Sequence, residues 1–385
     1  MDREKVKRIF REYFQSQGFN WRDTAPLCTP NPKLLFHISG GVVFEDIIES
    51  GATPRIARVV SIQRCLRTDN WNKVGTSGKH HLFFEMLGHF SFYEQGEFET
   101  KHLMIKSAWE FLTKVIHLSP SRFIITVHPQ DRISKEIWES LNPGKIVKKQ
   151  NNTNVSPHRK KSGLRSEIIW DKDKNFSVYG RYVELWNIVF TQYDNPDFRG
   201  PVMRKIAADS GMSLERLLMA IEDQPSDYHC SIWRPIIAAI QSQTSIVLKE
   251  KTAFRIADML RAVVALLAEG VLPGNKAENY VTRRIIREMI MLCRKVQLPI
   301  NRLTEAVKII SLEVGGDSDL IHALIEEEHV RFLRCLQRGE AACAKLLNRN
   351  QGHLSEDEIR FLKETYGYPP ELSRQQQVKW RANMQ

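Results

Sequence analysis

Two arginines and a dense aromatic run stand close together near the start of the chain. Arg64 and Arg67 close an apolar segment, and after a polar loop an aromatic run extends over residues 80–92. Arginine presents a rigid fork of donors that matches phosphate oxygens, and a phenylalanine ring offers a nucleobase a stacking surface. These residues predict a hairpin that binds a polyphosphate and a flat ring. The alternative is a core hairpin with a charged rim.

A second segment, residues 208–218, suits the same nucleotide. Gly211 and Ser213 let the backbone approach a ligand at the mouth of a helix, and Arg216 follows in the first turn. A helix N-terminus beside an arginine binds polyphosphate readily, although the pattern also occurs at ordinary helix starts. Asp209 would repel a phosphate, so we expect it to pair with an ammonium group.

One polar residue interrupts an apolar strand predicted over residues 182–193. Alternation places Asn187 on the same face as Leu185 and opposite to Trp186. A buried asparagine needs hydrogen-bond partners. Asn187 therefore either binds a substrate carboxylate or carbonyl, or bridges strands in a structural role.

The elements that must position these residues predict an α+β fold. Asp2 caps a helix that ends at Gly18, and a further helix is expected over residues 102–117. Strands are expected within residues 33–67 and at residues 81–93, 123–127 and 182–193. Together they give a mostly antiparallel sheet flanked by helices. By contrast, residues 144–165 are polar, basic and without period, which predicts a mobile loop that could contact an anionic substrate.

After about residue 235 the apolar spacing becomes helical. We therefore expect two domains, 1–235 with the sheet and 236–385 with helices only. Within the second, Arg283, Arg284 and Arg287 form a basic edge on one predicted helix. This edge is either a solvated face or a contact to a phosphate backbone.

Composition limits the class of protein. The chain has 385 residues, of which 42% are hydrophobic and 26% charged, as in an ordinary globular protein. It contains no apolar run long enough to span a membrane, and its start does not resemble a secretory signal. Six scattered cysteines argue against zinc and disulfides and suit a reducing, cytoplasmic location. The net charge of +11 permits a nucleic-acid partner.

In their order, these segments resemble the alanyl-tRNA synthetase family of class II. The resemblance covers nearly the whole chain and rests on residues 64–67, 80–88, 185–190, 209–216, 258–261, 270–275, 280–284 and 365–369. It implies a class II sheet followed by a helical domain. It also implies a short form or paralogue, because no chain is left for the family's editing and C-terminal domains.

The resemblance assigns a role to each candidate residue. It implies that Arg67 binds the α-phosphate of ATP, that Arg216 binds the far phosphates, and that Phe84 or its neighbour Phe83 stacks on adenine. Glu85 would be a ligand of Mg²⁺. Asp209 would bind the amino group of the amino acid, with Asn187 and Gly211 beside it. The residues implied for tRNA binding are Asn275, Arg283, Arg284 and Arg287.

Two departures from the family bear on function. Residues 144–165 replace a Gly- and Cys-rich segment that lies beside the family's amino-acid pocket, and Ser355 replaces an aspartate that the family uses with its asparagine to read tRNA. The expected function is ATP-dependent activation of alanine, or another small amino acid, and its transfer to tRNA. The alternatives are a paralogue that uses an acceptor other than tRNA, and a non-catalytic RNA-binding relative.

Overall fold

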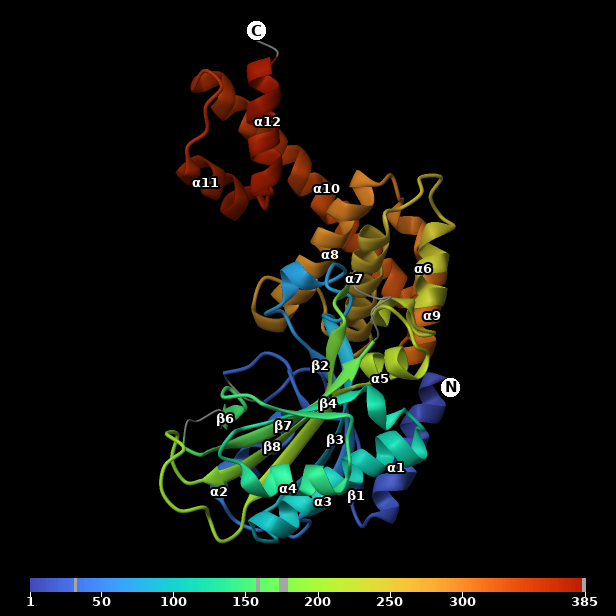
Figure 1. Cartoon of the computed structure of the whole chain (residues 1–385). Coiled ribbons are helices and arrows are strands. Elements are labelled where there is room, and N and C mark those ends of the chain that lie inside the picture. The colour runs from blue at the N-terminus through green and yellow to red at the C-terminus, as the bar shows by residue number, and fades with distance from the viewer. Residues whose placement is uncertain (31–32, 157–159, 173–178, 383–385) are drawn as a thin grey trace.

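The computed structural model describes residues 1–30, 33–156, 160–172 and 179–382. A sheet flanked by helices forms one end of the molecule, and helices form the other (Figure 1). The strands are β1 (Asn20–Arg22), β2 (Arg58–Leu66), β3 (Phe83–Phe92), β4 (Phe123–Val127), β5 (Lys145–Lys148), β6 (Thr153–Val155), β7 (Ser162–Asp171), β8 (Tyr182–Tyr193) and β9 (Ala207–Ser213). The helices of the sheet region are α1 (Arg3–Ser16), α2 (Glu45–Ser50), α3 (Glu97–Glu110), α4 (Arg132–Ser140) and α5 (Leu214–Ile221).

The described strands form one sheet in the order β1-β2-β3-β9-β8-β7-β4-β5, and β6 pairs with β7. Only the β1–β2 and β4–β5 pairs are parallel. The prediction of a mostly antiparallel sheet is therefore confirmed. The register places β9 between β3 and β8, so the two segments expected to bind one nucleotide are neighbours in the sheet.

One face of the sheet is covered by α1 and by the helix that follows β3. Asp2 caps α1, as predicted, because its carboxylate accepts a hydrogen bond from the backbone N–H of Lys5 at 2.8 Å. The apolar stripe of α1 is buried, and its Phe10 and Phe14 pack against Trp186 of β8. With this face filled by aromatic side chains, the opposite face is left for a ligand.

Two local predictions were wrong. Residues 144–165 do not form one loop, since β5, β6 and the start of β7 lie within them; residues 157–159 lie outside the described part. β5 and β6 are short, and charged residues are tolerated at the margin of a sheet, so their sequence lacks apolar alternation. Of the strands expected within residues 33–67, the described structure forms only β2, and Val42–Phe44 belongs to the 3-10 helix η1 (Gly40–Phe44).

After α5, the described part of the chain forms helices without any further strand. They are α6 (Trp233–Gln241), α7 (Glu250–Ala268), α8 (Ala277–Lys295), α9 (Thr304–Val314), α10 (Ser318–Arg349), α11 (Glu356–Tyr366) and α12 (Pro370–Ala382). Helices α11 and α12 lie at the end of the molecule away from the sheet (Figure 1). The predicted boundary at residues 235–236 falls inside α6, and a division into two domains there stays a prediction. None of the described helices is long and apolar enough to cross a membrane.

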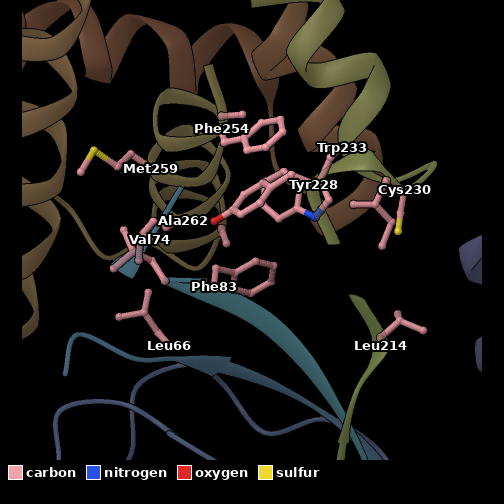
Figure 2. Close-up of a cluster of buried hydrophobic side chains, with 14 of the residues drawn as sticks. Leu66, Val74, Phe83, Leu214, Tyr228, Cys230, Trp233, Phe254, Met259 and Ala262 are labelled. Carbon is pink, nitrogen blue, oxygen red and sulfur yellow. The ribbon is translucent and has the colours of Figure 1, made fainter. Parts of the chain in front are cut away.

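A shared apolar core joins the helices to the sheet. Phe83 of β3 points toward the helices and lies among side chains from both regions (Figure 2). On the helical side these include Tyr228, Trp233 and Phe254, which are almost fully buried. Helix α7 is buried nearly all round, so it forms the centre of the helical region.

Candidate active site

The open face of the sheet carries a cavity of about 280 Å³. Strands β3, β9, β8 and β7 form its floor, and residues between β2 and β3 form part of its wall. Its lining residues are Ser39, Gly41, Arg67, Asn70, Lys79, His80, His81, Phe84, Met86, Arg165, Glu184, Leu185, Asn187, Val189, Asp209, Ser210, Gly211, Ser213 and Arg216. The structure thus brings Arg67, Phe84, Asn187, Asp209, Gly211 and Arg216 together, as the sequence predicts.

Arg67 and Phe84 meet at one end of the cavity. The guanidinium carbon of Arg67 lies 5.1 Å from the ring centroid of Phe84, and its Nε donates to the backbone carbonyl of Ile38 at 2.6 Å. The contact leaves a cation and an aromatic face at the same place. That pair can hold a phosphate and a flat base.

Arg216 stands in the first turn of α5. The N-cap Ser213 accepts a hydrogen bond from the backbone N–H of Arg216 at 3.4 Å, which fixes the helix start. The guanidinium donates to the backbone carbonyls of Glu184 (2.8 Å) and Lys79 (3.2 Å). Within the described residues neither Arg67 nor Arg216 forms an ion pair with a carboxylate, so both charges are available to an anion.

Asp209 supplies a negative charge on the floor of this basic cavity. Burial raises the pKa of its carboxyl to about 7. The 3-10 helix η1 passes close to the Asp209 carboxylate, since a Cβ on Gly41 would lie 3.2 Å from Asp209 Oδ2. A carboxylate in this position gains most from a compact cation such as an ammonium group.

Asn187 and Gly211 lie opposite each other on β8 and β9. The side-chain Oδ1 of Asn187 is buried and has no hydrogen-bond partner among the described residues. At Gly211 a Cβ would lie 2.7 Å from the sulfur of Met86, so any larger residue here would have to displace the Met86 side chain, which lines the same cavity. The free Asn187 oxygen favours the ligand-binding interpretation over the strand-bridging one.

Phe83 and Glu85 do not line the cavity, unlike the other residues predicted to bind ATP. Side chains alternate along β3, so Phe84 and Met86 line the cavity while Phe83 and Glu85 point to the other side. Phe83 is 1% exposed and packs against Arg261 of α7. Glu85 accepts hydrogen bonds from Arg3 Nε (2.8 Å) and Lys7 Nζ (3.0 Å) of α1. Of the two phenylalanines, only Phe84 lines the cavity, and the carboxylate of Glu85 is occupied by Arg3 and Lys7.

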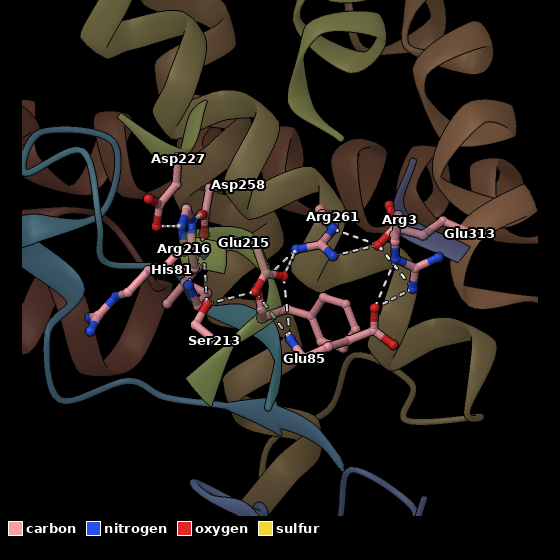
Figure 3. Close-up of polar contacts among 12 residues, drawn as sticks. Arg3, His81, Glu85, Ser213, Glu215, Arg216, Asp227, Asp258, Arg261 and Glu313 are labelled. Atoms are coloured by element: carbon pink, nitrogen blue, oxygen red, sulfur yellow. Dashed lines mark hydrogen bonds and ion pairs between the residues drawn. The ribbon is translucent and has the colours of Figure 1, made fainter. Parts of the chain in front are cut away.

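Behind the cavity a chain of ion pairs links four helices, α1, α5, α7 and α9 (Figure 3). Arg261 of α7 pairs with Glu215 of α5 at 2.9 Å, and both side chains are 0% exposed. Arg261 also pairs with Glu313 of α9, and Glu313 lies 3.5 Å from Arg3 of α1. Because Glu215 adjoins Arg216, the helices hold the start of α5 in place.

A second polar cluster supports the beginning of β3. Both ring nitrogens of His81 form hydrogen bonds with aspartate carboxylates: Nδ1 lies 2.8 Å from Asp258 Oδ2, and Nε2 lies 3.0 Å from Asp227 Oδ2. Asp258 also accepts from the backbone N–H of Leu82 at 2.9 Å. Burial opposes a charge on His81, but the hydrogen bonds and charges of the two aspartates outweigh burial and raise its pKa to about 9.

The residues expected to bind tRNA lie in the helical region and do not form one edge. Arg283 donates to the side chain of Asn275, which is exposed. Arg283 and Arg287 both pair with the buried Glu328 of α10, at 3.4 and 2.7 Å. Arg284 does not line this part of the surface with them: its guanidinium carbon lies 4.4 Å from the ring centroid of Trp71. Arg283 and Arg287 line a groove between α8 and α10, together with Arg331, Arg334 and Arg338.

Comparison with known proteins identifies the family. A model described as tRNA synthetases class II (A) matches residues 5–381. The chain belongs to this family. The alanine–tRNA ligase of Shouchella clausii is 30% identical over 403 residues, which cover 96% of this chain and 45% of that protein. That of Pseudothermotoga lettingae is 31% identical, with 97% of this chain and 46% of that protein covered.

This member of the class II family thus spans about half the length of the curated relatives it matches. Among solved structures, apo S. aureus histidyl-tRNA synthetase matches with a TM-score of 0.38 and 11% identity. That match covers 59% of this chain and 67% of the other.

Several residues that line the cavity were not among the site residues predicted from the sequence. Arg165, Val189 and Leu185 are examples, and Arg165 lies within the segment that was taken for a loop. Alternation along residues 162–171 would have placed Arg165 and Glu167 on one face, had that segment been recognised as a strand.

Proposed function

We propose that this chain activates an amino acid with ATP, as an aminoacyl-adenylate, and transfers it to tRNA. The observation that supports this most is the single cavity shared by Arg67, Phe84, Arg216, Asn187 and Asp209. Membership of the class II family points the same way. Since the relatives are named alanine–tRNA ligases, alanine is the first candidate, and another small amino acid is the second.

The residues of the chain divide the work. The adenine ring stacks on Phe84, Arg67 binds the α-phosphate, and Arg216 binds the phosphates beyond it. Asp209 binds the α-ammonium group, and Asn187 orients the amino acid. An oxygen of the substrate carboxylate then attacks the α-phosphorus, the bond to the bridging oxygen breaks, and pyrophosphate leaves. Positioning and charge stabilisation supply the catalysis, so no nucleophilic side chain is needed.

Mg²⁺ suits this site as a companion of ATP. In the described part of the chain no three His, Cys, Asp or Glu side chains are grouped to hold a metal. Magnesium usually keeps several waters and binds substrate phosphates with one or two carboxylates. Glu184, which lines the cavity, is a carboxylate available to it. When bound, the ion would neutralise phosphate charge.

The groove between α8 and α10 supports tRNA as the acceptor. Arg283, Arg287, Arg331, Arg334 and Arg338 line it, with Glu328 as its only acidic lining residue within the described chain. Such an excess of arginine matches the phosphate backbone of RNA. In the transfer step, a ribose hydroxyl of the tRNA attacks the adenylate carbonyl and AMP leaves.

The test is pyrophosphate exchange with each of the twenty amino acids, followed by charging of total tRNA. Exchange with one amino acid and charging of tRNA are expected. Exchange without charging would favour an acceptor other than tRNA. Silence in exchange, with salt-sensitive RNA binding intact, would favour the non-catalytic alternative.

A further inference from the structure

The amino-acid end of the cavity contains a cation that the reaction above does not use. The register sets Arg165 of β7 opposite Val189 of β8, and Val189 opposite Asp209 of β9. All three line the cavity, so they form a row across its floor. Adjacent strands lie about 4.8 Å apart, which places the Cα atoms of Arg165 and Asp209 roughly 10 Å from each other.

Under the proposed function, this row gives a direction for the substrate side chain. With its ammonium group on Asp209 and its carboxylate toward Arg67, an amino acid has its Cα above the middle of the floor. Its side chain can then extend over Val189 toward Arg165. A methyl group would end short of the guanidinium, whereas a side chain with an acidic end would reach it.

The charges around Arg165 are not balanced. Glu167 accepts a hydrogen bond from Lys149 Nζ at 2.8 Å and lies 3.1 Å from Arg165 Nη2. It also accepts from the hydroxyl of Thr126 at 3.0 Å. Among the described residues, one buried carboxylate therefore serves two cations, and of these two only Arg165 lines the cavity.

The hydrogen bonds of Arg165 are also incomplete. Nη2 donates to the backbone carbonyl of Asn151 at 3.3 Å. Nε is buried and has no hydrogen-bond partner among the described residues. An unpaired buried donor on a charged group is unfavourable. The Arg165 side chain as a whole is 25% exposed and lines the cavity, so an anionic substrate oxygen can approach its guanidinium from the cavity side.

Resting on the proposed function, we propose that the site selects an amino acid whose side chain ends in a carboxylate, bound by Arg165. Aspartate is the smallest such amino acid and agrees with the expectation of a small substrate; glutamate is the other. A pocket built to hydrogen-bond a substrate group rejects analogues without it strongly. The proposal thus departs from alanine, the candidate suggested by the names of the relatives: alanine would leave the guanidinium without a substrate acceptor and should be activated poorly.

The test is pyrophosphate exchange with aspartate, glutamate, asparagine and alanine, for wild type, Arg165→Gln and the control Arg58→Ala. Arg58 pairs with Glu94 and does not line the cavity. We expect kcat/KM for one acidic amino acid to exceed that for alanine at least 100-fold. Arg165→Gln should reduce it at least 100-fold, without a change in the KM for ATP or in alanine exchange. A preference of wild type for alanine, or an equal loss for every amino acid in Arg165→Gln, would overturn the proposal.

Binding separates this proposal from failure of the proposed function. If no amino acid supports exchange, the proposed function fails, and non-hydrolysable aspartyl-, glutamyl- and alanyl-sulfamoyl adenosines are compared by calorimetry. Tighter binding of an acidic analogue that Arg165→Gln abolishes supports selection by Arg165. Equal or tighter binding of the alanyl analogue overturns it.

Discussion

The guanidinium of Arg67 lies over the ring of Phe84, and both side chains line the cavity. Arg67 follows the end of β2, and Phe84 stands at the start of the neighbouring strand β3. The hydrogen bond to the carbonyl of Ile38 holds Arg67 there without neutralising its charge. The cation and the aromatic ring are thus ordered by each other. Under the proposed function, these two side chains supply the charged donor and the flat surface for ATP.

Arg67→Ala should reduce exchange about 10²- to 10³-fold, since loss of one donor to a developing charge costs about 3 to 4 kcal/mol. Arg64→Ala is the matched control, because Arg64 pairs with Glu269 and does not line the cavity. The measurement is pyrophosphate exchange at saturating amino acid. Equal losses in the two variants would contradict the role of Arg67.

Amino-acid binding should depend on pH through Asp209. Burial raises the pKa of its carboxyl to about 7, and only the ionised form pairs with an ammonium group. Below pH 7, kcat/KM for the amino acid should therefore fall about tenfold per pH unit, and above pH 7 it should level off. In Asp209→Asn, kcat/KM for the amino acid should be about 10- to 100-fold below the wild-type value above pH 7, and it should not depend on pH. An unchanged pH profile in the variant would remove this assignment.

Glu85 should matter for stability and not for metal use. Burial raises its pKa, but the charges of Arg3, Lys7 and Arg261 outweigh burial and lower it to about 2. Its stabilising effect is therefore present above about pH 4.5 and lost as the pH falls through 2. At pH 7, Glu85→Gln should lower the free energy of unfolding by roughly 3 to 5 kcal/mol in urea titrations. A higher Mg²⁺ requirement at unchanged stability would restore the metal role.

His81 should make stability fall at alkaline pH. Its pKa is raised to about 9 in the folded protein, so its contribution is complete below about pH 6.5 and is lost as the pH rises through 9. Such a shift corresponds to about 3 kcal/mol. Urea unfolding at pH 6.5 and pH 10 should show this loss in wild type and a smaller one in His81→Gln. His80→Gln is the control, because burial and Arg216 lower the pKa of His80 to about 4.

The groove on α10 should act on tRNA only. Replacing Arg334 and Arg338 with alanine removes two exposed cations far from the ATP cavity. Charging of tRNA should weaken, and the slope of log K against log salt should become shallower by about 1.4 to 1.8. Exchange should not change. If charging keeps its salt dependence, RNA binds elsewhere.

Local patterns predicted the strands but not always their faces or partners. Strands β4 and β8 match residues 123–127 and 182–193, since apolar alternation is strong there. The same alternation could have chosen Phe84 over Phe83 once Met86 was assigned to the cavity.

Contacts between distant parts of the chain could not be predicted. Glu85 meets its partners on α1, and Arg261 meets Glu215, across separations of 46 to 82 residues. No spacing in the sequence indicates such pairs. The short strands β5 and β6 were missed for a related reason, because they are specified by their neighbours in the sheet and not by their own residues.

The fully buried pair of Arg261 and Glu215 makes the helices part of the catalytic fold. A polypeptide that stopped at residue 235 would lack the counter-ion of Glu215 and would expose the apolar side chains of β3 and α5 that pack against the helical region. It would also lose Asp258 from beneath β3. Natural shortening of this chain therefore cannot proceed through the helices toward a minimal sheet: any ancestral or engineered miniature has to keep α7, or replace Glu215 by an uncharged residue at the same time.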